Sequence, residues 1–257
     1  MPIVTLTTDY GNKDFSIGAL KGSILKSGES VTIVDISHNI TSFNITEAAF
    51  ILNCAYRDFP EGTIHIVTVN DMDSRECRTI AIEYDNHYFL GFDNGVLSML
   101  MQGRAVNIVE LEDQGESSIS FPGKEVFANA SAELANGKTI ASIGRVIPTI
   151  KERNELMPIV QKSLIRGTVI YVDSYQNLIL NITRDLFVQV GENSKFVMSF
   201  RRGDQIDLLS ESYHDVPQGE KLCLFNSNGY MEIAINSGKA SSLLGLSLGD
   251  TVQIDFI

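Results

Sequence analysis

The residues best suited to chemistry near the start of the chain are acidic and follow an apolar, β-branched run. Asp9 comes directly after residues 3–8, and Gly11 allows the backbone to turn sharply behind it. A carboxylate in this place can accept hydrogen bonds from two vicinal hydroxyls, such as those of a ribose. It can equally close a turn or cap a helix. Asp14 and Ser16 follow where a helix should begin, and capping explains them equally well.

A second polar stretch, residues 70–78, follows another strand-like run. Its carboxylates, Asp71, Asp73 and Glu76, could recruit a metal ion or another cation, although acidic loop residues are more often solvated turns. Cys77 could act as a nucleophile, but no histidine stands beside it in the sequence to activate it. Residues 70–78 therefore include candidate cation ligands and a candidate nucleophile, but the sequence does not show which chemistry they perform.

The histidines and cysteines form no recognisable metal-binding pattern. The three cysteines are widely spaced and include no CxxC pair, which indicates neither a disulfide framework nor a zinc site. Of the four histidines, His87 and His214 lie beside expected turns and should be on the surface. We therefore expect no metal and no resident cofactor.

The composition is typical of a soluble globular protein, with 44% hydrophobic and 20% charged residues among 257. This length is enough for one large or two ordinary domains. The net charge of −12 argues against a nucleic-acid partner, because phosphate binding needs a basic face. No run approaches the ~20 apolar residues that span a bilayer, and no basic segment precedes the N-terminal apolar run. We expect a cytoplasmic protein that binds neither nucleic acid nor membrane.

The elements that must position these residues alternate between strand and helix in the first half of the chain. The pattern predicts strands, helices and one hairpin in the following order: strand 3–8, helix 15–26, strand 31–36, helix 45–56, strand 63–69, hairpin 79–84 and 87–92, helix 96–101, strand 106–111 and helix 126–136. Such an order gives an α/β domain with a mostly parallel or mixed sheet and helices on both faces. Ligands usually bind at the carboxyl ends of its parallel strands, where Asp9 and residues 70–78 lie.

The second half reads as short strands joined by hairpin turns. From residue 167 onward, alternating runs are separated by turn signals such as Gly203-Asp204 and Asn228-Gly229. This pattern is typical of a small all-β barrel. We expect an α/β domain over residues 1–155, a linker over 156–166 and a β-barrel domain over 167–257.

Several motifs in succession resemble those of one family. The segments in order are TTDYGNKDFSIGALKG (residues 7–22), VDISHNI (34–40), FPEGTIHI (59–66), FDNGVLSML (92–100), VDSYQNLILNI (172–182) and NSNGYMEIAINSGKA (226–240). They are similar to motifs of the S-adenosylmethionine (SAM) hydroxide adenosyltransferases and of the related fluorinases and chlorinases. Because the similarity runs in order along nearly the whole chain, chance agreement is improbable.

The resemblance implies both a fold and a ligand. It implies an α/β domain, a β-barrel domain and a homotrimer that binds SAM, adenosine or methionine between neighbouring subunits, with SAM as substrate or ligand. Matching positions take on the family's roles: Asp9 for the ribose hydroxyls, Phe43 as an aromatic ring against the ribose, Asp14, Ser16 and Ser227 for the methionine ammonium and carboxylate, and Asp173 and Asn177 from the second domain, with Asn177 towards adenine.

This chain departs from the family at the groups that handle water. Hydroxide-using members carry an Asp, an Arg and a His around the attacking water, and a gapless alignment places Asn70, Cys77 and Pro122 at these three positions. Asn70 can hydrogen-bond water but cannot act as a base, and Pro122 can do neither. Loss of a positioned general base typically reduces the rate by about 10²- to 10⁴-fold.

A shift in the alignment would change the candidates. Within residues 70–78, Asp71 could stand in for the missing Asp, and Arg75 or Arg78 for the missing Arg. Halogenation fits poorly, because Asn70 replaces the halogenases' Tyr and a nearby Asp73 would repel halide. Two hypotheses remain: a SAM hydrolase that forms adenosine and L-methionine, and a catalytically inactive protein that binds or senses SAM or an adenine nucleoside.

Overall fold

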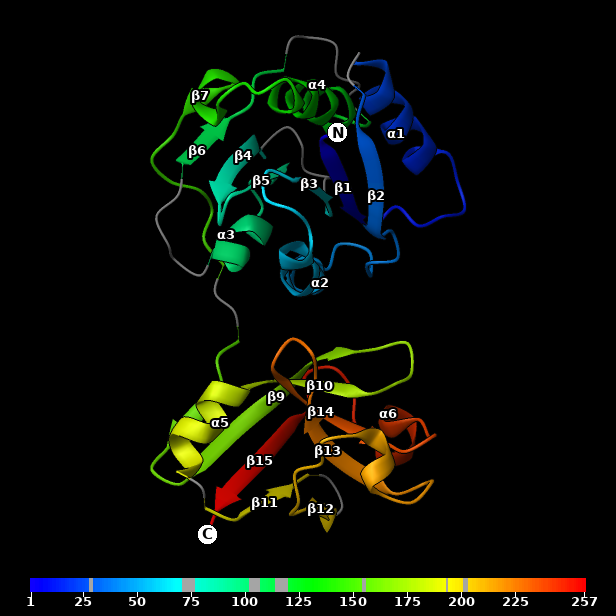
Figure 1. Ribbon diagram of the computed structural model, residues 1–257, viewed down its shortest axis with the longest axis vertical. Helices are drawn as coiled ribbons and strands as arrows, with labels where there is room; N and C mark the ends of the chain where they lie inside the picture. Colours follow the sequence, from blue (N-terminus) through cyan, green and yellow to red (C-terminus); the bar gives the residue numbers. More distant parts are fainter. Residues whose placement is uncertain are drawn as a thin grey trace. The chain divides into compact units, whose positions relative to one another are not determined.

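The computed structural model describes residues 1–27, 30–70, 77–101, 107–113, 120–153, 156–192, 194–200 and 203–257 (Figure 1). The chain divides into two compact units, Met1–Glu155 and Leu156–Ile257. The first is an α/β unit and the second is an antiparallel, barrel-like unit. Each has its own hydrophobic core.

The first unit is built on a mixed seven-stranded sheet. Its strands, in spatial order, are β2 (Thr32–Ser37), β1 (Ile3–Thr8), β3 (Ile64–Thr68), β5 (His87–Phe92), β4 (Thr79–Tyr84), β6 (Asn107–Glu110) and β7 (Arg145–Val146). The first four are mutually parallel, and the last three pair antiparallel. The carboxyl ends of β1, β2, β3 and β5 therefore lie along one edge of the sheet.

Helices cover both faces of this sheet (Figure 1). The helical segments are α1 (Ser16–Lys26), α2 (Ile45–Ala55), η1 (Tyr56–Asp58), α3 (Val96–Met101), α4 (Gly123–Ala135) and η2 (Ile140–Ser142). Side chains alternate between the faces of a strand. Val4 and Leu6 of β1 accordingly pack with α1 and α4, whereas Val67 of β3 packs with α2 and α3.

The second unit is a nearly closed antiparallel sheet. Its strands are β8 (Ile159–Gln161), β9 (Leu164–Val172), β10 (Leu178–Thr183), β11 (Phe196–Ser199), β12 (Gln205–Ile206), β13 (Lys221–Phe225), β14 (Tyr230–Ile235) and β15 (Thr251–Phe256). The sheet runs in the order β12-β11-β15-β9-β10-β14-β13, and β8 adds to β9. A bridge between Leu209 and Cys223 brings the chain after β12 back to β13, so the sheet almost closes on itself.

Helical segments in the second unit complete its core. They are α5 (Arg184–Gly191), η4 (Tyr213–Asp215) and α6 (Ala240–Leu244). The sequence pattern did not predict α5, which begins with Thr183 as N-cap, its side chain accepting a hydrogen bond from the Leu186 amide. Phe187 of α5 then packs edge-on against Phe196 and Phe256. The helix therefore fills one side of the barrel core.

Three expectations from the sequence need correction. Residues 156–166 are not a linker, because they belong to the second unit and form β8 and the beginning of β9. Helix α4 begins at Gly123, three residues before the expected start. His87 is not on the surface: its side chain is 4% exposed and packs edge-on against the Tyr56 ring, because the Asp85-Asn86 turn ends just before it and β5 runs inward.

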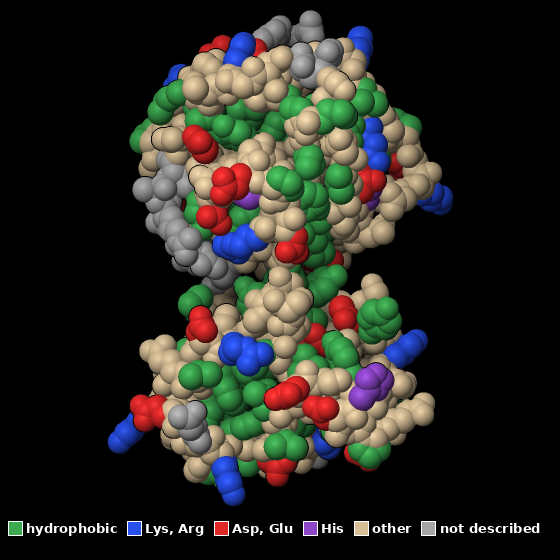
Figure 2. Space-filling model, viewed as in Figure 1, with side chains coloured by type: hydrophobic (Ala, Val, Ile, Leu, Met, Phe, Trp, Pro, Cys, Tyr) green, Lys and Arg blue, Asp and Glu red, His purple; other side chains and the backbone are tan. Residues whose placement is uncertain are grey.

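The surface carries charges of both signs. Among the described residues on the face shown in Figure 2, Lys and Arg side chains are scattered and do not gather into one patch. Within the described residues, no helix is both long enough and apolar enough to span a membrane.

Candidate functional site

Asp9 is the residue at which three loops of the first unit meet. Its Oδ2 accepts a hydrogen bond from the Phe43 amide at 2.8 Å and another from the Asn70 amide at 3.3 Å. Asp9 follows β1, Phe43 precedes α2 and Asn70 follows β3, all at the carboxyl-end edge of the parallel strands. The fold thus brings together three residues that sequence analysis proposed separately.

Both donors to Asp9 have unusual backbone conformations. Phe43 has φ of +68° and Asn70 has φ of +57°, in the left-handed region that residues other than glycine rarely occupy. Backbone strain of this kind persists where surrounding contacts hold it, and it is frequent at functional sites. The Asp9 carboxylate supplies such a contact to both residues. The Phe43 ring remains 53% exposed, so it is available to pack against a ligand.

Both hydrogen bonds that the described residues give to Asp9 reach the same oxygen. A carboxylate has about four acceptor positions over its two oxygens. Asp9 can therefore hold the two loops through Oδ2 and still accept hydroxyl groups of a ligand. This division of roles fits a carboxylate that binds a vicinal diol.

Asp14 and Ser16 lie at the beginning of α1, close behind Asp9 in the chain. The Ser16 amide donates to Asp14 Oδ1 at 3.4 Å, and Asp14 is exposed. The residue in the N-cap position is Phe15, whose side chain accepts no capping bond. Asp14 thus has the short local bond expected of a helix start, and its carboxylate still faces solvent.

Of the three positions that the alignment predicts for the water-handling groups, Asn70 contacts Asp9, and Pro122 is next to a ring that contacts Tyr10. Asn70 binds Asp9 through its backbone, as described above. Cys77 and Phe121 are partly buried against the same hydrophobic cluster as Tyr10, and the Tyr10 and Phe121 rings meet edge to face at 5.3 Å. Pro122, next to Phe121, is the N-cap residue of α4. Next to Asp9 in the chain, Tyr10 therefore packs on an aromatic ring, while Cys77 belongs to the hydrophobic cluster of this face of the sheet.

Arg78, one of the possible substitutes, is engaged in an ion pair. Its Nε lies 3.1 Å from Asp93 Oδ2, and its Nη2 donates to the Thr149 carbonyl at 3.3 Å. The other oxygen of Asp93 accepts the Lys151 amide at 2.7 Å. Arg78 and Asp93 thus tie the segment after β7 to the end of β5. Asp71 and Arg75, the other possible substitutes, lie outside the described residues, as do Asp73 and Glu76.

Sequence reasoning missed the structural role of the residues next to Asp93. The Asn94 side chain donates to the Val69 carbonyl at 2.8 Å and accepts the Val96 amide at 3.1 Å. It thereby fixes the residue before Asn70 and the start of α3 at the same time. The FDNGVLSML motif was the available signal, but a side chain that bridges residues 25 positions apart cannot be recognised from local sequence.

In the second unit, Asp173 and Asn177 form one tight turn between β9 and β10. Asp173 Oδ1 accepts the amides of Tyr175 and Asn177 at 2.9 and 2.8 Å, and its Oδ2 accepts from the Asn177 side chain at 3.0 Å. Asn177 is buried, whereas Asp173 is only partly covered. The turn is therefore rigid, with its carboxylate towards one end of the barrel.

Ser227 lies in the hairpin between β13 and β14, and a buried acid connects this hairpin to the Asp173 turn. Ser227 is exposed, while the neighbouring Asn226 holds the hairpin by accepting two backbone amides at 3.1 Å. Burial raises the pKa of Glu232, against hydrogen bonds from Tyr213 and Asn226, and the nearby charge of Asp173 raises it further. Asp173 and the Ser227 hairpin therefore lie near each other within this unit.

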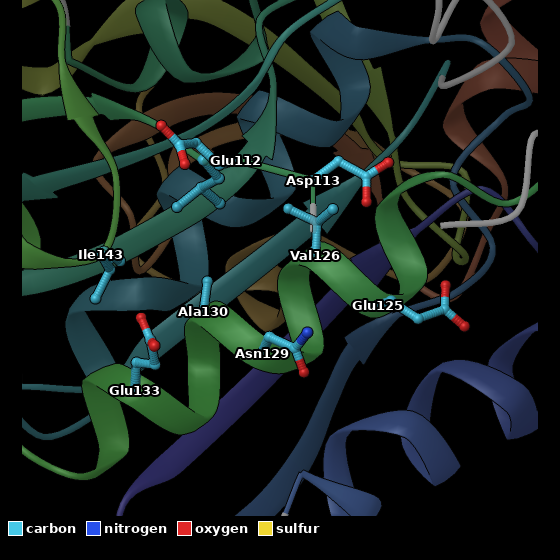
Figure 3. Close-up of a pocket in the computed structure, with 9 residues that line it drawn as sticks. Glu112, Asp113, Glu125, Val126, Asn129, Ala130, Glu133 and Ile143 are labelled. Carbon is cyan, nitrogen blue, oxygen red and sulfur yellow. The ribbon is translucent and has the colours of Figure 1, made fainter. Parts of the chain in front are cut away.

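The pocket in Figure 3 is not part of this arrangement. It lies beside α4 and the segment after β6, where Glu112, Asp113, Glu125 and Glu133 line it. It encloses about 30 Å³, which is room for one or two water molecules and too little for a nucleoside. Glu125 and Glu133 are also paired with lysines. In the described part of the chain, no group of three or more His, Cys, Asp or Glu side chains is arranged to hold a metal ion.

Several known proteins are similar to this chain over nearly its whole length. A (R)-S-adenosyl-L-methionine hydrolase from Methanocaldococcus jannaschii is 29% identical over 266 residues, which cover 99% of this chain and 96% of the relative. A fluorinase from an Actinoplanes species is 23% identical over 98% of this chain and 97% of its own length. The crystal structure of an uncharacterized conserved protein from Thermotoga maritima superposes with a TM-score of 0.90 at 30% identity, covering 98% of this chain and 99% of that one.

The family descriptions match each unit separately. Residues 4–144 match the SAM hydroxide adenosyltransferase N-terminal domain, and residues 167–253 match the C-terminal domain of the same family. The first range contains Asp9, Phe43 and Asn70, and the second contains Asp173, Asn177 and Ser227. Together the two matches span most of the sequence, and the chain belongs to the SAM hydroxide adenosyltransferase family.

Proposed function

We propose that this protein binds SAM through its adenosyl group and hydrolyses it slowly to adenosine and L-methionine. The observation that carries the proposal is the Asp9 carboxylate, which holds two strained loops through one oxygen and keeps acceptor capacity for a ribose diol. Membership of the family and the similarity to (R)-SAM hydrolases support SAM as the ligand. Asp14, Ser16 and Ser227 are the proposed contacts for the methionine end, and Asn177 for adenine.

The reaction is an in-line displacement. A water oxygen forms a bond to the ribose C5′ while the bond from C5′ to sulfur breaks, the sulfur keeps the electron pair as a neutral thioether, and water releases one proton. Because a sulfonium is already a good leaving group, catalysis consists mainly of aligning the water and removing its proton. Asn70 can orient water, but a general base is missing from the three positions described above. A slow reaction follows from that difference.

A second candidate function is binding without turnover. Pro122, next to the Phe121 ring that meets Tyr10, favours it, because a proline side chain cannot accept a proton from water. Such a protein would sense or sequester SAM or an adenine nucleoside. The two candidates share the ligand and differ only in the chemical step.

The test combines calorimetry with product analysis. Purified protein is titrated with SAM, adenosine and L-methionine, and adenosine release from each sulfur epimer of SAM is followed by chromatography, because the relatives are named for the R epimer. Adenosine formation above the uncatalysed rate supports hydrolysis, and tight binding without adenosine supports the second candidate. Lack of binding to all three ligands would rule out both.

Two variants make the test specific to the site. Asp9→Asn removes the charge that receives the diol, and we expect adenosine affinity to fall about 10- to 100-fold, as for loss of a charged hydrogen bond. Asp58→Asn is the matched control, because Asp58 is an exposed carboxylate in η1 of the same unit. Asn70→Asp restores a carboxylate at a position whose left-handed φ an aspartate tolerates. A faster reaction in this variant would place the missing base at residue 70.

We also propose a homotrimer in which residues of the second unit of one subunit complete the site of its neighbour. Light scattering after size-exclusion chromatography should then give three times the subunit mass of 28.3 kDa. A monomeric mass together with full SAM binding would contradict this arrangement.

A further inference from the structure

A chain of polar side chains lies directly behind Asp9, with Thr8 and His38 buried and Asp35 and Lys21 partly exposed. The Thr8 hydroxyl is 3.1 Å from Nδ1 of His38, and Nε2 of His38 is 3.1 Å from Oδ1 of Asp35. The other oxygen of Asp35 accepts from the Lys21 ammonium at 2.6 Å. These residues come from β1, β2 with the loop behind it, and α1. Two of them, Asp35 and His38, belong to the VDISHNI motif.

The contact between Asp35 and His38 depends on an irregularity in the sheet. Leu6 of β1 pairs with Asp35, whereas the next residue, Thr7, pairs with Ser37, so Ile36 is an extra residue in β2. In a regular strand, residues three apart point to opposite faces. A bulge changes that alternation, and bulges are common beside active sites. The extra residue lies between Asp35 and His38, whose side chains approach each other just beyond the end of β2.

The Thr8 hydroxyl and Nδ1 of His38 share the hydrogen bond in this chain of side chains. Nε2 of His38 lies 3.1 Å from Oδ1 of Asp35 without the geometry of a hydrogen bond. The Thr8 oxygen in turn accepts the Tyr10 amide at 3.3 Å. Partial burial raises the pKa of Asp35, but the Lys21 ammonium and the His38 ring beside the carboxylate outweigh burial, and the pKa lies below its ordinary value of 3.8. Asp35 is thus a charged group beside the His38 ring.

The same histidine segment also holds the backbone beyond Asp9. The Gly11 amide donates to the His38 carbonyl at 2.7 Å, and the Ile40 amide donates to the Thr8 carbonyl at 3.4 Å. Residues on both sides of Asp9 are therefore attached to His38 or its neighbours, through side chain and main chain. Asp9 lies on a short arc of backbone whose two ends are held by one element.

The order hydroxyl, imidazole, carboxylate is that of a catalytic triad, but here it has no access to a substrate. Thr8 is completely buried and His38 is 4% exposed. A nucleophile must reach the substrate, so this threonine cannot serve as one. The remaining function for the chain is to fix geometry.

We propose that His38, held by Asp35, is a positioning residue that orients the Asp9 carboxylate for the ribose diol by fixing the backbone on both sides of it. The inference rests on the proposed function, because it assumes that Asp9 receives the diol. Misplacement by even a fraction of an ångström weakens hydrogen bonds to two vicinal hydroxyls together. Loss of the Thr8 to His38 bond should therefore affect a ligand with the diol more than one without it.

The experiment compares adenosine with 2′,3′-dideoxyadenosine, which lacks both hydroxyls. The ratio of their two dissociation constants is measured by calorimetry for the wild type, Thr8→Val, Thr8→Ser and Thr5→Val. We expect Thr8→Val to reduce the preference for adenosine about threefold to tenfold and Thr8→Ser to retain it. Thr5→Val is the matched control, since Thr5 is buried on the same strand and bonds another histidine away from the Asp9 loop. It should keep the wild-type ratio even if its melting temperature falls.

The outcomes separate this inference from the proposed function. If the wild type binds both nucleosides equally or neither, the diol contact of the proposed function fails and this inference fails with it. If the wild type prefers adenosine and Thr8→Val prefers it equally, only the inference is overturned. Should Thr8→Val fail to fold, Asp35→Asn replaces it, because the Asp35 side chain is 42% exposed and tolerates the change. An unchanged ratio in Asp35→Asn would overturn the inference in the same way.

Discussion

Two threonines of β1 each bond a histidine from a neighbouring segment, and the surroundings of the two histidines differ. On β1, the Thr8 hydroxyl meets Nδ1 of His38 at 3.1 Å, and the Thr5 hydroxyl meets Nδ1 of His65 at 2.7 Å. Both threonines are completely buried. The pairs differ in what the second ring nitrogen of each histidine meets.

The second nitrogen of His65 meets another imidazole inside an aromatic cluster. Its Nε2 lies 3.2 Å from Nδ1 of His87, and its ring stacks on Phe89 with ring centres 4.9 Å apart. Tyr56 contacts both histidine rings edge-on. Burial lowers the pKa of His65 to about 3, and the neighbouring His87 contributes to the shift. The His65 ring is therefore kept neutral and serves the core.

The second nitrogen of His38 meets a carboxylate that is itself bonded to a lysine near solvent. This histidine stands at the carboxyl-end edge of the sheet, beside the loop of Asp9. The comparison teaches that the role of a buried histidine depends on the group beside its second ring nitrogen. Aromatic neighbours make His65 part of the hydrophobic core. A carboxylate near solvent leaves His38 free to support the neighbouring Asp9 loop.

The largest expected effect is on the free energy of unfolding when each of the two histidine rings, His65 and His38, is removed. His65→Ala should destabilise the fold by about 3 kcal/mol, because it removes a completely buried ring and leaves a cavity. His38→Ala should lower the free energy of unfolding by less, because the polar groups around His38 reach solvent through Asp35 and Lys21. Urea denaturation of both variants measures the difference. Equal or reversed losses would show that the two histidines are not distinguished by packing.

The next effect concerns pH. The pKa of His65 falls from 6.5 to about 3 on folding. Below pH 6.5, His65 therefore binds a proton in the unfolded chain but stays neutral in the folded protein. The contribution of the neutral His65 ring to the unfolding free energy is fully present above pH 6.5 and is lost as pH falls towards 3. The unfolding free energy should fall by about 2 kcal/mol between pH 7 and pH 5 for this reason. Denaturation at the two pH values should show a smaller loss for His65→Gln. The exposed His214→Gln is the control and should keep the wild-type loss.

A smaller effect tests the hydroxyl of the core pair. Thr5→Val keeps the shape of the side chain but leaves Nδ1 of His65 without its partner, and we expect a loss of about 1.5 kcal/mol in unfolding free energy. Thr5→Ser should recover most of it. If Thr5→Val is as stable as the wild type, the 2.7 Å contact contributes little and the pair is held by ring packing alone.

The smallest effect is expected at the outer end of the other network. Lys21→Met removes a pair between two partly exposed groups, which should contribute about 0.5 kcal/mol or less. The difference from the wild type should vanish in 1 M salt, because the charges are then screened within about 3 Å. A loss above about 2 kcal/mol, or one that salt leaves unchanged, would mean that Lys21 supports the His38 network more strongly than a surface pair can.

Local sequence predicted much of the first unit. Strand β1, the hairpin of β4 and β5, and helix α3 begin and end at the predicted residues, because β-branched runs, the Asp85-Asn86 turn and helical spacing act over a few residues. Helix α5 was missed because its local sequence favours a helix only weakly. The helix is stabilised by the Thr183 cap and by the packing of Phe187 in the barrel core. The surface position predicted for His87 was wrong because a turn next to a residue says nothing about what covers it.

The candidate site shows the same limit at longer range. The motifs identified the family and most of the proposed ligand contacts, including Asp9, Phe43 and Asp173, by residue type and order. They did not indicate that the amides of Phe43 and Asn70 would both bond one oxygen of Asp9, since these partners lie 34 and 61 residues away along the chain. Residues 71–76, where two substitute groups were predicted, lie outside the described residues, and their roles stay predictions.

The sequence by itself determined the order of elements in the first unit, the α/β and β-barrel classes and the family, because propensity, periodicity and motif order are properties of neighbouring residues. The tertiary structure alone decided which polar groups meet. The parallel pairing of β1 with β2 and β3 brings Thr8, His38 and Asp9 to one edge, and it places Asp35 Oδ1 3.1 Å from Nε2 of His38. Such contacts depend on register between strands, which is set by the packing of the whole sheet and not by any segment alone.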